Sequence, residues 1–255
     1  MRPASSAVAS EVSPWAAKGR SESTSSSGTL NSLATLPRSH ASSSCTEGVR
    51  LWNCVVSPGA PDAGASTATT FLGIDLPFPL LLAPVAHQRL VHPDGELATA
   101  LGAASCGAAM CVSTLASTAL EDIAAQASSP LVFQLYMQGG RDAALSLVRR
   151  AEKAGYRALM VTVDAPVNGI RNDEQRAGFR LPAHVRPVNI EGMEGPVSRA
   201  GPGESPVFKG LLDGAPTWAD IEWLRGQTSL PLILKGIVHP QDAERAIRLG
   251  ADAIA

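Results

Sequence analysis

Short apolar runs alternate with segments whose apolar residues recur at helical spacing, from about Phe71 to the end of the chain. The run from Ala158 to Val163 has β-branched residues near its end, follows Gly155 and is stopped by Pro166. Such a run is typical of a buried parallel strand. The repeated alternation therefore predicts an α/β fold built on one parallel sheet.

The pattern predicts where the individual elements lie. The expected strands are Leu80–Ala83, Ala108–Ser113, Leu131–Tyr136, Ala158–Val163, Pro231–Lys235 and a run from Ala251 onward. The expected helices are one capped by Asp94, one opened by a capping box of Thr118 and Glu121, and three over Asp142–Ala154, Thr217–Arg225 and Gln241–Leu249. Their inward positions are expected to include Leu97, Ala100, Leu101, Ala104, Leu145, Val148, Ala243, Ala246 and Ile247.

Glycine and the irregular segments divide the chain further. Gly107, Gly155 and Gly250 each stand between a helix and a strand, where a left-handed residue closes a short turn. Leu51–Thr70 is expected to be irregular, and Pro166–Pro216 is long enough to be a lid or excursion. Residues 1–48 are Ser/Ala-rich and predict disorder or a targeting segment, which leaves 49–255 as the folded domain.

Composition favours a small-molecule partner. The 255 residues carry a formal net charge of −2 and no dense Lys/Arg block, so we expect no nucleic-acid partner. No apolar run approaches the roughly 20 residues that span a bilayer, so no stable membrane insertion is expected. The four cysteines lack zinc-type pairing, predict no metal site and are interpreted as buried reduced thiols.

The strand from Ala158 to Val163 ends in residues that can do chemistry. Thr162, Asp164 and Arg171 lie at or after its carboxyl end. In a barrel of alternating strands and helices, the carboxyl ends of the strands carry the active site. The loops there can vary in sequence, while the rigid strands fix the positions at which the loops begin.

Six segments in order resemble the family of FMN-dependent α-hydroxy-acid oxidases and dehydrogenases, to which glycolate oxidase, lactate oxidase and the mandelate-oxidising enzymes belong. The segments are Leu82-Ala-Pro-Val-Ala-His-Gln, His92-Pro-Asp-Gly-Glu, Val112-Ser-Thr-Leu-Ala-Ser, Phe133-Gln-Leu-Tyr, Val161-Thr-Val-Asp-Ala-Pro and Leu234-Lys-Gly-Ile. The resemblance implies a (β/α)₈ TIM barrel with FMN across the carboxyl-end mouth, a fold more specific than the α/β sheet that the pattern predicts.

The resemblance also assigns the cofactor-binding residues. Pro84, Val85 and Ala86 would run their backbone along the flavin, although Pro-Thr-Ala is more usual in the family. The polar edge of the ring would be hydrogen-bonded by three residues at strand ends, which are Ser113, Gln134 and Thr162. Lys235 would lie near flavin N1 and O2, where a cation stabilises the reduced ring.

Tyr136 and Arg171 are the expected substrate-binding residues. The guanidinium of Arg171 offers a planar fork for a carboxylate, and the Tyr136 hydroxyl would donate to the same group. Family members often carry two adjacent arginines here, whereas Ile170 precedes Arg171 in this chain. A core tyrosine and a solvated arginine are the alternative interpretation.

Several family features are absent from the 255 residues. The motif Ser-Asn-His-Gly-Gly-Arg, which holds the base histidine, is not found, nor are the later glycine-rich segments that bind the FMN phosphate. No tyrosine precedes Tyr136, and His87, His92, His184 and His239 do not match the motif. No catalytic residue is therefore nominated, and the barrel is expected to be incomplete, with five to six strand-helix units.

The resemblance implies oxidation of an L-2-hydroxy acid of the lactate, glycolate or mandelate class to the 2-oxo acid. The electron acceptor would be oxygen or another molecule, and full-length relatives are expected to be homo-oligomers. This protein is expected in the cytoplasm, with organellar targeting by its N-terminal segment as the alternative. Two alternatives stay open: a catalytically inactive fragment or half-barrel of such an enzyme, and an aldolase-type barrel with Lys235 as Schiff-base nucleophile.

Overall fold

The computed structural model describes residues 66–137, 139–166, 171–193, 201–205 and 215–255. The chain divides into two units, Met1–Cys45 and Thr46–Ala255, and every described residue belongs to the second. The predicted disordered or targeting segment 1–48, and with it the proposed start of the domain at residue 49, lies outside the described residues.

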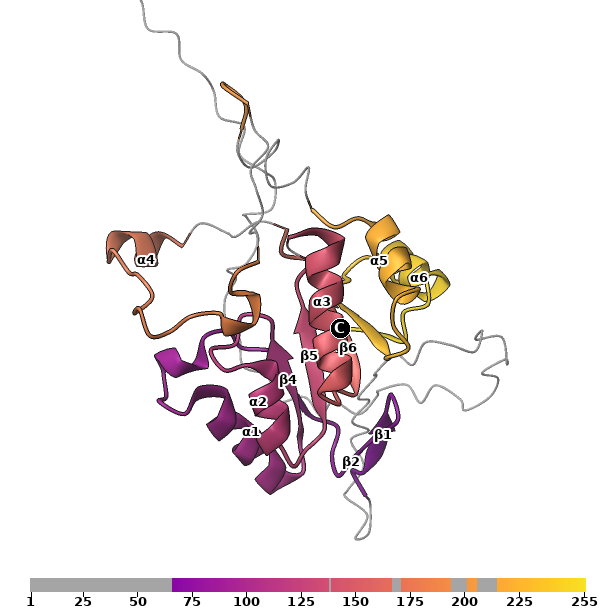
Figure 1. The fold of residues 1–255 in the computed structure, drawn as a ribbon. Helices are drawn as coiled ribbons and strands as arrows, with labels where there is room; N and C mark the ends of the chain where they lie inside the picture. The colour runs from indigo at the N-terminus through magenta and orange to yellow at the C-terminus, as the bar shows by residue number, and fades with distance from the viewer. Residues whose placement is uncertain (1–65, 138, 167–170, 194–200, 206–214) are drawn as a thin grey trace, which may run out of the picture. The chain divides into compact units, whose positions relative to one another are not determined.

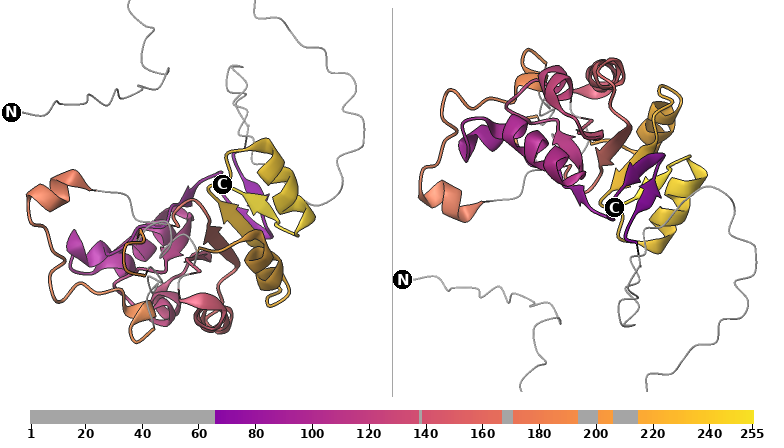
Figure 2. Two further views of the ribbon diagram at one scale, coloured as in Figure 1. Left: turned by 90° about the horizontal axis from the view of Figure 1, so that it is seen from above. Right: turned by 90° about the horizontal axis from the view of Figure 1, so that it is seen from below.

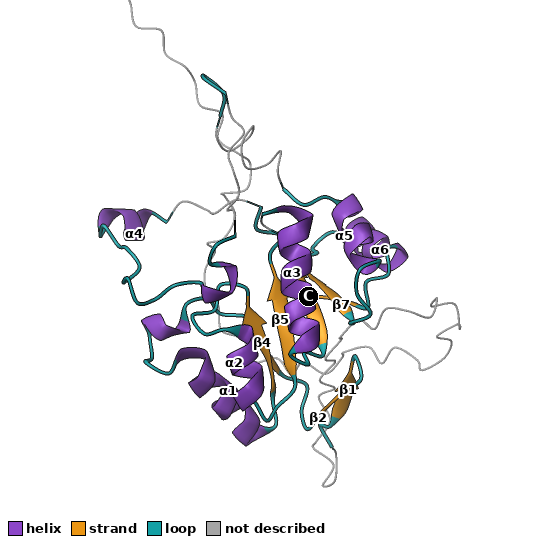
Figure 3. Cartoon of the chain, in the orientation of Figure 1, coloured by secondary structure: helices purple, strands orange, loops and turns teal. Residues whose placement is uncertain are grey.

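A six-stranded parallel sheet forms the centre of the described residues. Its strands are β3 (Leu81–Leu82), β4 (Ala109–Ser113), β5 (Leu131–Leu135), β6 (Ala158–Thr162), β7 (Leu232–Lys235) and β8 (Ala253–Ile254). They pair in sequence order, and each pair is parallel. The sheet curls as part of a (β/α)₈ barrel, which confirms the predicted fold (Figures 1 and 3).

The long helices pack along the outer face of this sheet (Figures 1 and 2). They are α1 (Gly95–Cys106), α2 (Leu120–Gln126), α3 (Gly140–Lys153), α5 (Trp218–Arg225) and α6 (Pro240–Arg248). Gly107, Gly155 and Gly250 have φ angles of 71°, 83° and 85°, so the left-handed turns predicted between helices and strands are confirmed.

Successive side chains along each strand point to opposite faces of the sheet, which gives two separate buried clusters. Residues such as Val112, Phe133 and Val161 face the helices and join a core that includes Leu120 and Leu147. On the opposite, inner face, the buried residues of the second cluster are Ala109, Cys111, Val132, Ala158, Met160, Ile233 and Ala253.

An antiparallel hairpin covers part of the inner face. It consists of β1 (Thr69–Phe71) and β2 (Ile74–Leu76), and its Ile74 and Leu76 are buried in the inner cluster. The expectation that Leu51–Thr70 is irregular was wrong for the last two residues of that range, because Thr69 and Thr70 belong to β1. The hairpin lies below the sheet in Figure 1.

Two expected helix starts differ in the structure. Helix α2 begins at Leu120 after the cap residue Ala119, so the capping box of Thr118 and Glu121 was wrong. The hydroxyl of Thr118 instead donates to Glu96, and the carboxylate of Glu121 pairs with Arg150. Asp94 does stand at the cap of α1, but its side chain makes no capping hydrogen bond.

Some expected inward residues face solvent. Leu101 is 74% exposed and Ile247 is 37% exposed, whereas Ala103 is buried on α1. The predicted inward positions of Ala100 and Ala246 are confirmed, because both residues are buried. The prediction of buried thiols is correct for Cys111 and wrong for Cys106, which is exposed; Cys45 and Cys54 lie outside the described residues.

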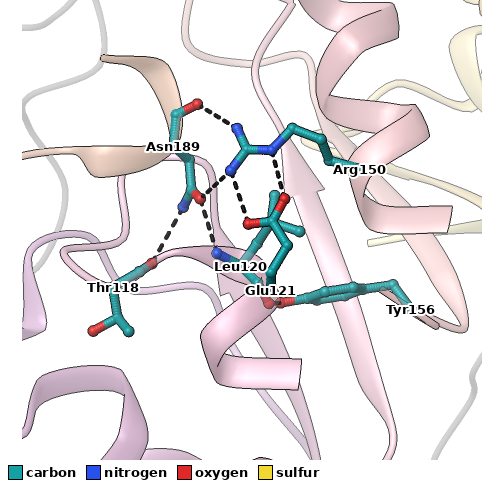
Figure 4. A network of polar contacts seen from close by, with 6 residues as sticks. All are labelled: Thr118, Leu120, Glu121, Arg150, Tyr156 and Asn189. Atoms are coloured by element: carbon teal, nitrogen blue, oxygen red, sulfur yellow. Dashed lines mark hydrogen bonds and ion pairs between the residues drawn. The ribbon is translucent and has the colours of Figure 1, made fainter. Parts of the chain in front are cut away.

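The predicted excursion between Pro166 and Pro216 is described in part. It contains α4 (Asn172–Arg176) and the 3₁₀ turn η2 (Val188–Ile190). Helix α4 lies away from the sheet in all three views (Figures 1 and 2). By contrast, η2 is anchored, because Asn189 is 1% exposed and contacts Thr118, Leu120 and Arg150 (Figure 4).

Candidate functional site

The candidate site lies on the inner face of the sheet, where the strands end. Ser113 and Gln134 are register partners on β4 and β5, and Thr162 and Lys235 are register partners on β6 and β7. All four continue the alternation of the inner buried cluster, so their side chains follow those of residues such as Cys111 and Met160. The structure therefore brings together the four strand-end residues predicted to contact the flavin ring.

The side chain of Gln134 joins three of these strands. It is 1% exposed, accepts from the Ser113 hydroxyl at 3.2 Å and donates to the Thr162 hydroxyl at 3.1 Å. Its carbonyl oxygen also accepts from the backbone N–H of Thr114 at 3.2 Å. Burial of this amide is tolerated because its N–H and its carbonyl oxygen are both hydrogen-bonded. The same hydrogen bonds hold the ends of β4, β5 and β6 in one arrangement.

Lys235 supplies a positive charge beside this polar row. Its ammonium nitrogen lies 3.4 Å from the Asp164 carboxylate oxygen Oδ1, and its side chain is 31% exposed. Asp164 in turn packs against Gly236, where a Cβ atom would come within 2.5 Å of the Asp164 side chain. Only glycine permits this close approach, and its φ of 108° also favours glycine.

The loop after β3 forms the adjoining part of the site. It contains Pro84, Val85 and Ala86, of which Val85 is 54% exposed and Pro84 half-buried. The 3₁₀ turn η1 (Gln88–Leu90) follows and is buried at Gln88. His87, at the cap of η1, adopts a left-handed conformation, and its backbone N–H donates to the Leu115 carbonyl in the loop after β4.

The two predicted substrate-binding residues are not brought together. Tyr136 follows β5 directly, is half-buried, and its backbone N–H donates to the Thr114 hydroxyl. Arg171 stands at the cap of α4, away from the sheet, with a side chain 74% exposed and paired with Glu174 at 2.9 Å. Neighbouring residues 167–170 lie outside the described residues.

Two of the four histidines that do not match the family motif make local contacts with the backbone. His239 caps α6, because its Nδ1 accepts from the Gln241 N–H. His92 Nδ1 accepts from the Asp94 N–H in the loop before α1. Both imidazoles therefore accept hydrogen bonds from the backbone near the start of a helix.

Sequence reasoning missed Glu96 as a residue of this region. Its carboxylate is fully buried and accepts hydrogen bonds from Gln88, Ser117 and Thr118. Burial would raise the pKa of this carboxyl, but the hydrogen bonds from backbone and side chains outweigh burial and hold its pKa below the ordinary value. The only sequence signal was its place in the segment His92-Pro-Asp-Gly-Glu.

The hydrogen-bonding groups of the site fit the polar edge of a flavin ring. Gln134 uses one of its two amide hydrogens on Thr162, and Thr162 accepts that bond, so its own hydroxyl hydrogen is left for another acceptor. Lys235 likewise keeps hydrogens beyond the contact with Asp164. These donors suit a flat heterocycle with carbonyl oxygens and ring nitrogens along one side, and the exposed apolar side chain of Val85 belongs to the loop after β3, which pairs with β4.

Known proteins share both the sequence and the fold. A family model described as FMN-dependent dehydrogenase matches residues 57–255. L-lactate oxidase of Alicycliphilus denitrificans is 46% identical over 186 residues, which are 72% of this chain and 51% of that protein. Glycolate oxidase 3 of Arabidopsis thaliana is 37% identical over 189 residues, with 73% and 51% covered.

A crystal structure of mandelate oxidase with (S)-2-phenylpropionate superposes with a TM-score of 0.64 at 38% identity, covering 74% of this chain and 50% of that chain. The chain thus spans about half the length of the relatives it matches. Within the described residues, no helix is both long and apolar enough to cross a membrane. The family match extends over most of the chain and includes every strand of the sheet, so this chain belongs to the FMN-dependent dehydrogenase family.

Proposed function

We propose that this chain forms the flavin-ring side of the active site of an enzyme that oxidises L-2-hydroxy acids to 2-oxo acids. The observation that carries this proposal is the row of Ser113, Gln134, Thr162 and Lys235 at the carboxyl ends of four neighbouring strands. FMN, when bound, supplies the two-electron acceptor for this chemistry. Oxygen or another acceptor would then take up the electrons.

The chain's own residues would bind and orient the ring. Ser113, Gln134 and Thr162 would hydrogen-bond its polar edge, and the backbone of Pro84, Val85 and Ala86 would pass along it. Lys235 would hold positive charge next to the atoms on which negative charge develops, an arrangement that lowers the energy of the reduced form. Because Asp164 already pairs with Lys235, this cation is kept in place before a ligand arrives.

Tyr136 and Arg171 are proposed to bind the substrate carboxylate. Tyr136 follows the strand that carries Gln134, so its position beside the ring site needs no rearrangement of the sheet. Arg171 would have to approach from α4 and exchange its partner Glu174 for the substrate. This exchange is inexpensive, because an ion pair between exposed side chains contributes only about 0–1 kcal/mol.

The relatives support the class of substrate. The matched proteins are named for lactate, glycolate and mandelate, which are all 2-hydroxy acids. The proposed reaction removes two electrons and two protons from the carbinol group, and the motif that would hold the base for one proton is not among the 255 residues. We therefore expect little or no turnover by these 255 residues alone, since loss of a general base costs about 10²–10⁴-fold.

Flavin binding tests the proposal directly. The 255-residue chain is titrated with riboflavin and with FMN, and binding is followed by quenching of flavin fluorescence. We expect both to bind with similar affinity, because the described contacts involve the ring and not the phosphate. Binding of neither flavin would overturn the proposal. Anaerobic bleaching of the bound flavin by L-lactate or L-mandelate would instead show that these residues are a complete catalyst.

A further inference from the structure

The buried carboxylate of Glu96 joins two loops that come from neighbouring strands. Its Oε1 accepts from the Gln88 N–H at 3.2 Å and from the Ser117 N–H at 2.8 Å. The hydroxyl of Ser117 donates to the same carboxylate at 3.0 Å, and that of Thr118 at 2.9 Å. Gln88 belongs to the loop after β3, and the other two residues belong to the loop after β4.

Both loops adjoin residues of the candidate flavin site. The loop after β3 contains Pro84, Val85 and Ala86, only a few residues before Gln88. The loop after β4 follows directly on Ser113, the last residue of that strand. Two further contacts tie them together: the Arg89 N–H donates to the Ser117 hydroxyl at 3.1 Å, and the His87 N–H donates to the Leu115 carbonyl at 3.0 Å.

The start of α1 is shaped to bring Glu96 into this position. Gly95 precedes it with a φ of 50°, and a Cβ atom there would lie 2.7 Å from Arg89 Cγ and 3.2 Å from the Arg89 nitrogen. Helix α1 therefore begins directly against η1, and Glu96 projects from its first turn between the two loops. A fully buried carboxylate is costly unless its oxygens are well hydrogen-bonded, and four donors meet that need here.

From this geometry we propose that Glu96 is a positioning residue. It fixes the loop after β3 against the loop after β4, so that Pro84, Val85 and Ala86 are held in place relative to Ser113 at the end of β4. This inference rests on the proposed flavin site for its functional part. The coupling of the two loops by Glu96 does not depend on whether a flavin binds. Glu96 touches neither substrate nor ring in this account, and it acts through the backbone N–H groups that it holds.

The test compares Glu96→Ala, Glu96→Gln and Glu152→Gln by hydrogen exchange and by riboflavin binding. Glu152 is the matched control, because its carboxylate accepts from the Thr228 hydroxyl and from Arg149 at the end of α3, away from both loops. We expect Glu96→Ala to raise amide exchange in residues 84–90 and 113–118 together. Riboflavin affinity should fall by about tenfold to a hundredfold, as expected when supporting contacts are lost.

Glu96→Gln should change both measurements less than Glu96→Ala does, since its amide oxygen still accepts from the two backbone N–H groups. If Glu96→Ala does not fold, Thr118→Val removes a single bond to the same carboxylate and should shift both readouts in the same direction by less. Unchanged riboflavin affinity at a temperature well below the unfolding midpoint, or greater exchange in only one loop, would overturn the proposal.

Failure of the flavin site gives a different pattern. If the unaltered chain binds no riboflavin, the proposed function is wrong, and the flavin part of this inference falls with it. Amide exchange then still decides whether Glu96 couples the loops, because that measurement needs no ligand.

Discussion

The side chain of Asn189 accepts a hydrogen bond from the backbone N–H of Leu120 at 2.9 Å, although the two residues are 69 positions apart. Leu120 is the first residue of α2, so a residue of η2 provides the cap that the helix lacks locally. Asn189 also donates to the Thr118 carbonyl and accepts from Arg150 (Figure 4). The turn η2 is therefore packed against the helix layer.

Asn189→Ala should destabilise the chain by about 1–3 kcal/mol. The substitution removes a helix cap and leaves the buried Leu120 N–H without its acceptor. Urea denaturation followed by circular dichroism measures the loss. Asn172→Ala is the control, because Asn172 is exposed in the first turn of α4. Equal denaturation midpoints for the two variants would show that the cap contributes nothing.

Glu121→Gln should weaken the acid sensitivity of stability. The hydrogen bond from Arg150 is the main cause that holds the Glu121 pKa below its ordinary 4.5, with bond lengths of 2.7 and 2.9 Å. A carboxyl whose pKa is lowered by folding adds stability above its unfolded pKa, and that stability is lost as pH falls through the folded pKa. The glutamine variant lacks this contribution at every pH.

The measurement is the free energy of unfolding from about pH 7 down to about pH 3. The unaltered chain should be more stable than Glu121→Gln above the ordinary pKa, and the difference should shrink as the solution becomes more acidic. Glu174→Gln is a useful comparison, because Glu174 also pairs with an arginine but lies on the exposed helix α4. A difference that stays constant over this range would contradict the expected role of ionised Glu121.

The sheet was predictable because parallel strands buried on both faces appear in sequence as unbroken apolar runs. Each predicted strand overlaps the observed one, and β5 and β6 even begin at the predicted residue. The hairpin of β1 and β2 was missed because its strands have only three residues each. Its signal was the alternation of Ile74, Asp75 and Leu76 after Gly73.

The clustering of the candidate-site residues was predictable where strand position alone brings them together. Ser113, Gln134, Thr162 and Lys235 meet because each stands at the same end of a parallel strand. Glu96 and Asn189 could not be found this way, since their partners lie on other elements and depend on how helices dock. The local pattern was misleading here. Thr118 and Glu121 have capping-box spacing, but the Thr118 hydroxyl donates to Glu96 and the Glu121 carboxylate pairs with Arg150.

Gly236→Ala should destabilise the chain more than Gly155→Ala. Both glycines have positive φ, for which a side chain costs about 1–2 kcal/mol. A Cβ at Gly155 would meet nothing within 4 Å, whereas one at Gly236 would come within 2.5 Å of Asp164. Gly236→Ala must therefore also move Asp164, the partner of Lys235. Chemical denaturation of both variants measures the difference, and equal losses would mean that Asp164 moves aside freely.

Gln134→Leu should both destabilise the chain and weaken riboflavin binding. Leucine has a similar size but leaves the N–H of Thr114 and the hydroxyls of Ser113 and Thr162 without their partner. Loss of a buried acceptor for one N–H costs about 1–3 kcal/mol. Denaturation and fluorescence quenching on the same preparation give the two effects separately.

Gln126→Leu is the control for this exchange, because Gln126 is exposed at the end of α2 and should change neither measurement. Glutamate at position 134 separates the two roles further. It keeps an acceptor for Thr114 but removes the amide donor to Thr162 and places a negative charge beside the polar row. Stability should then fall less than in Gln134→Leu while riboflavin affinity falls at least as far. Unchanged affinity in both variants would mean that the polar row holds the strands together and does not bind the ring.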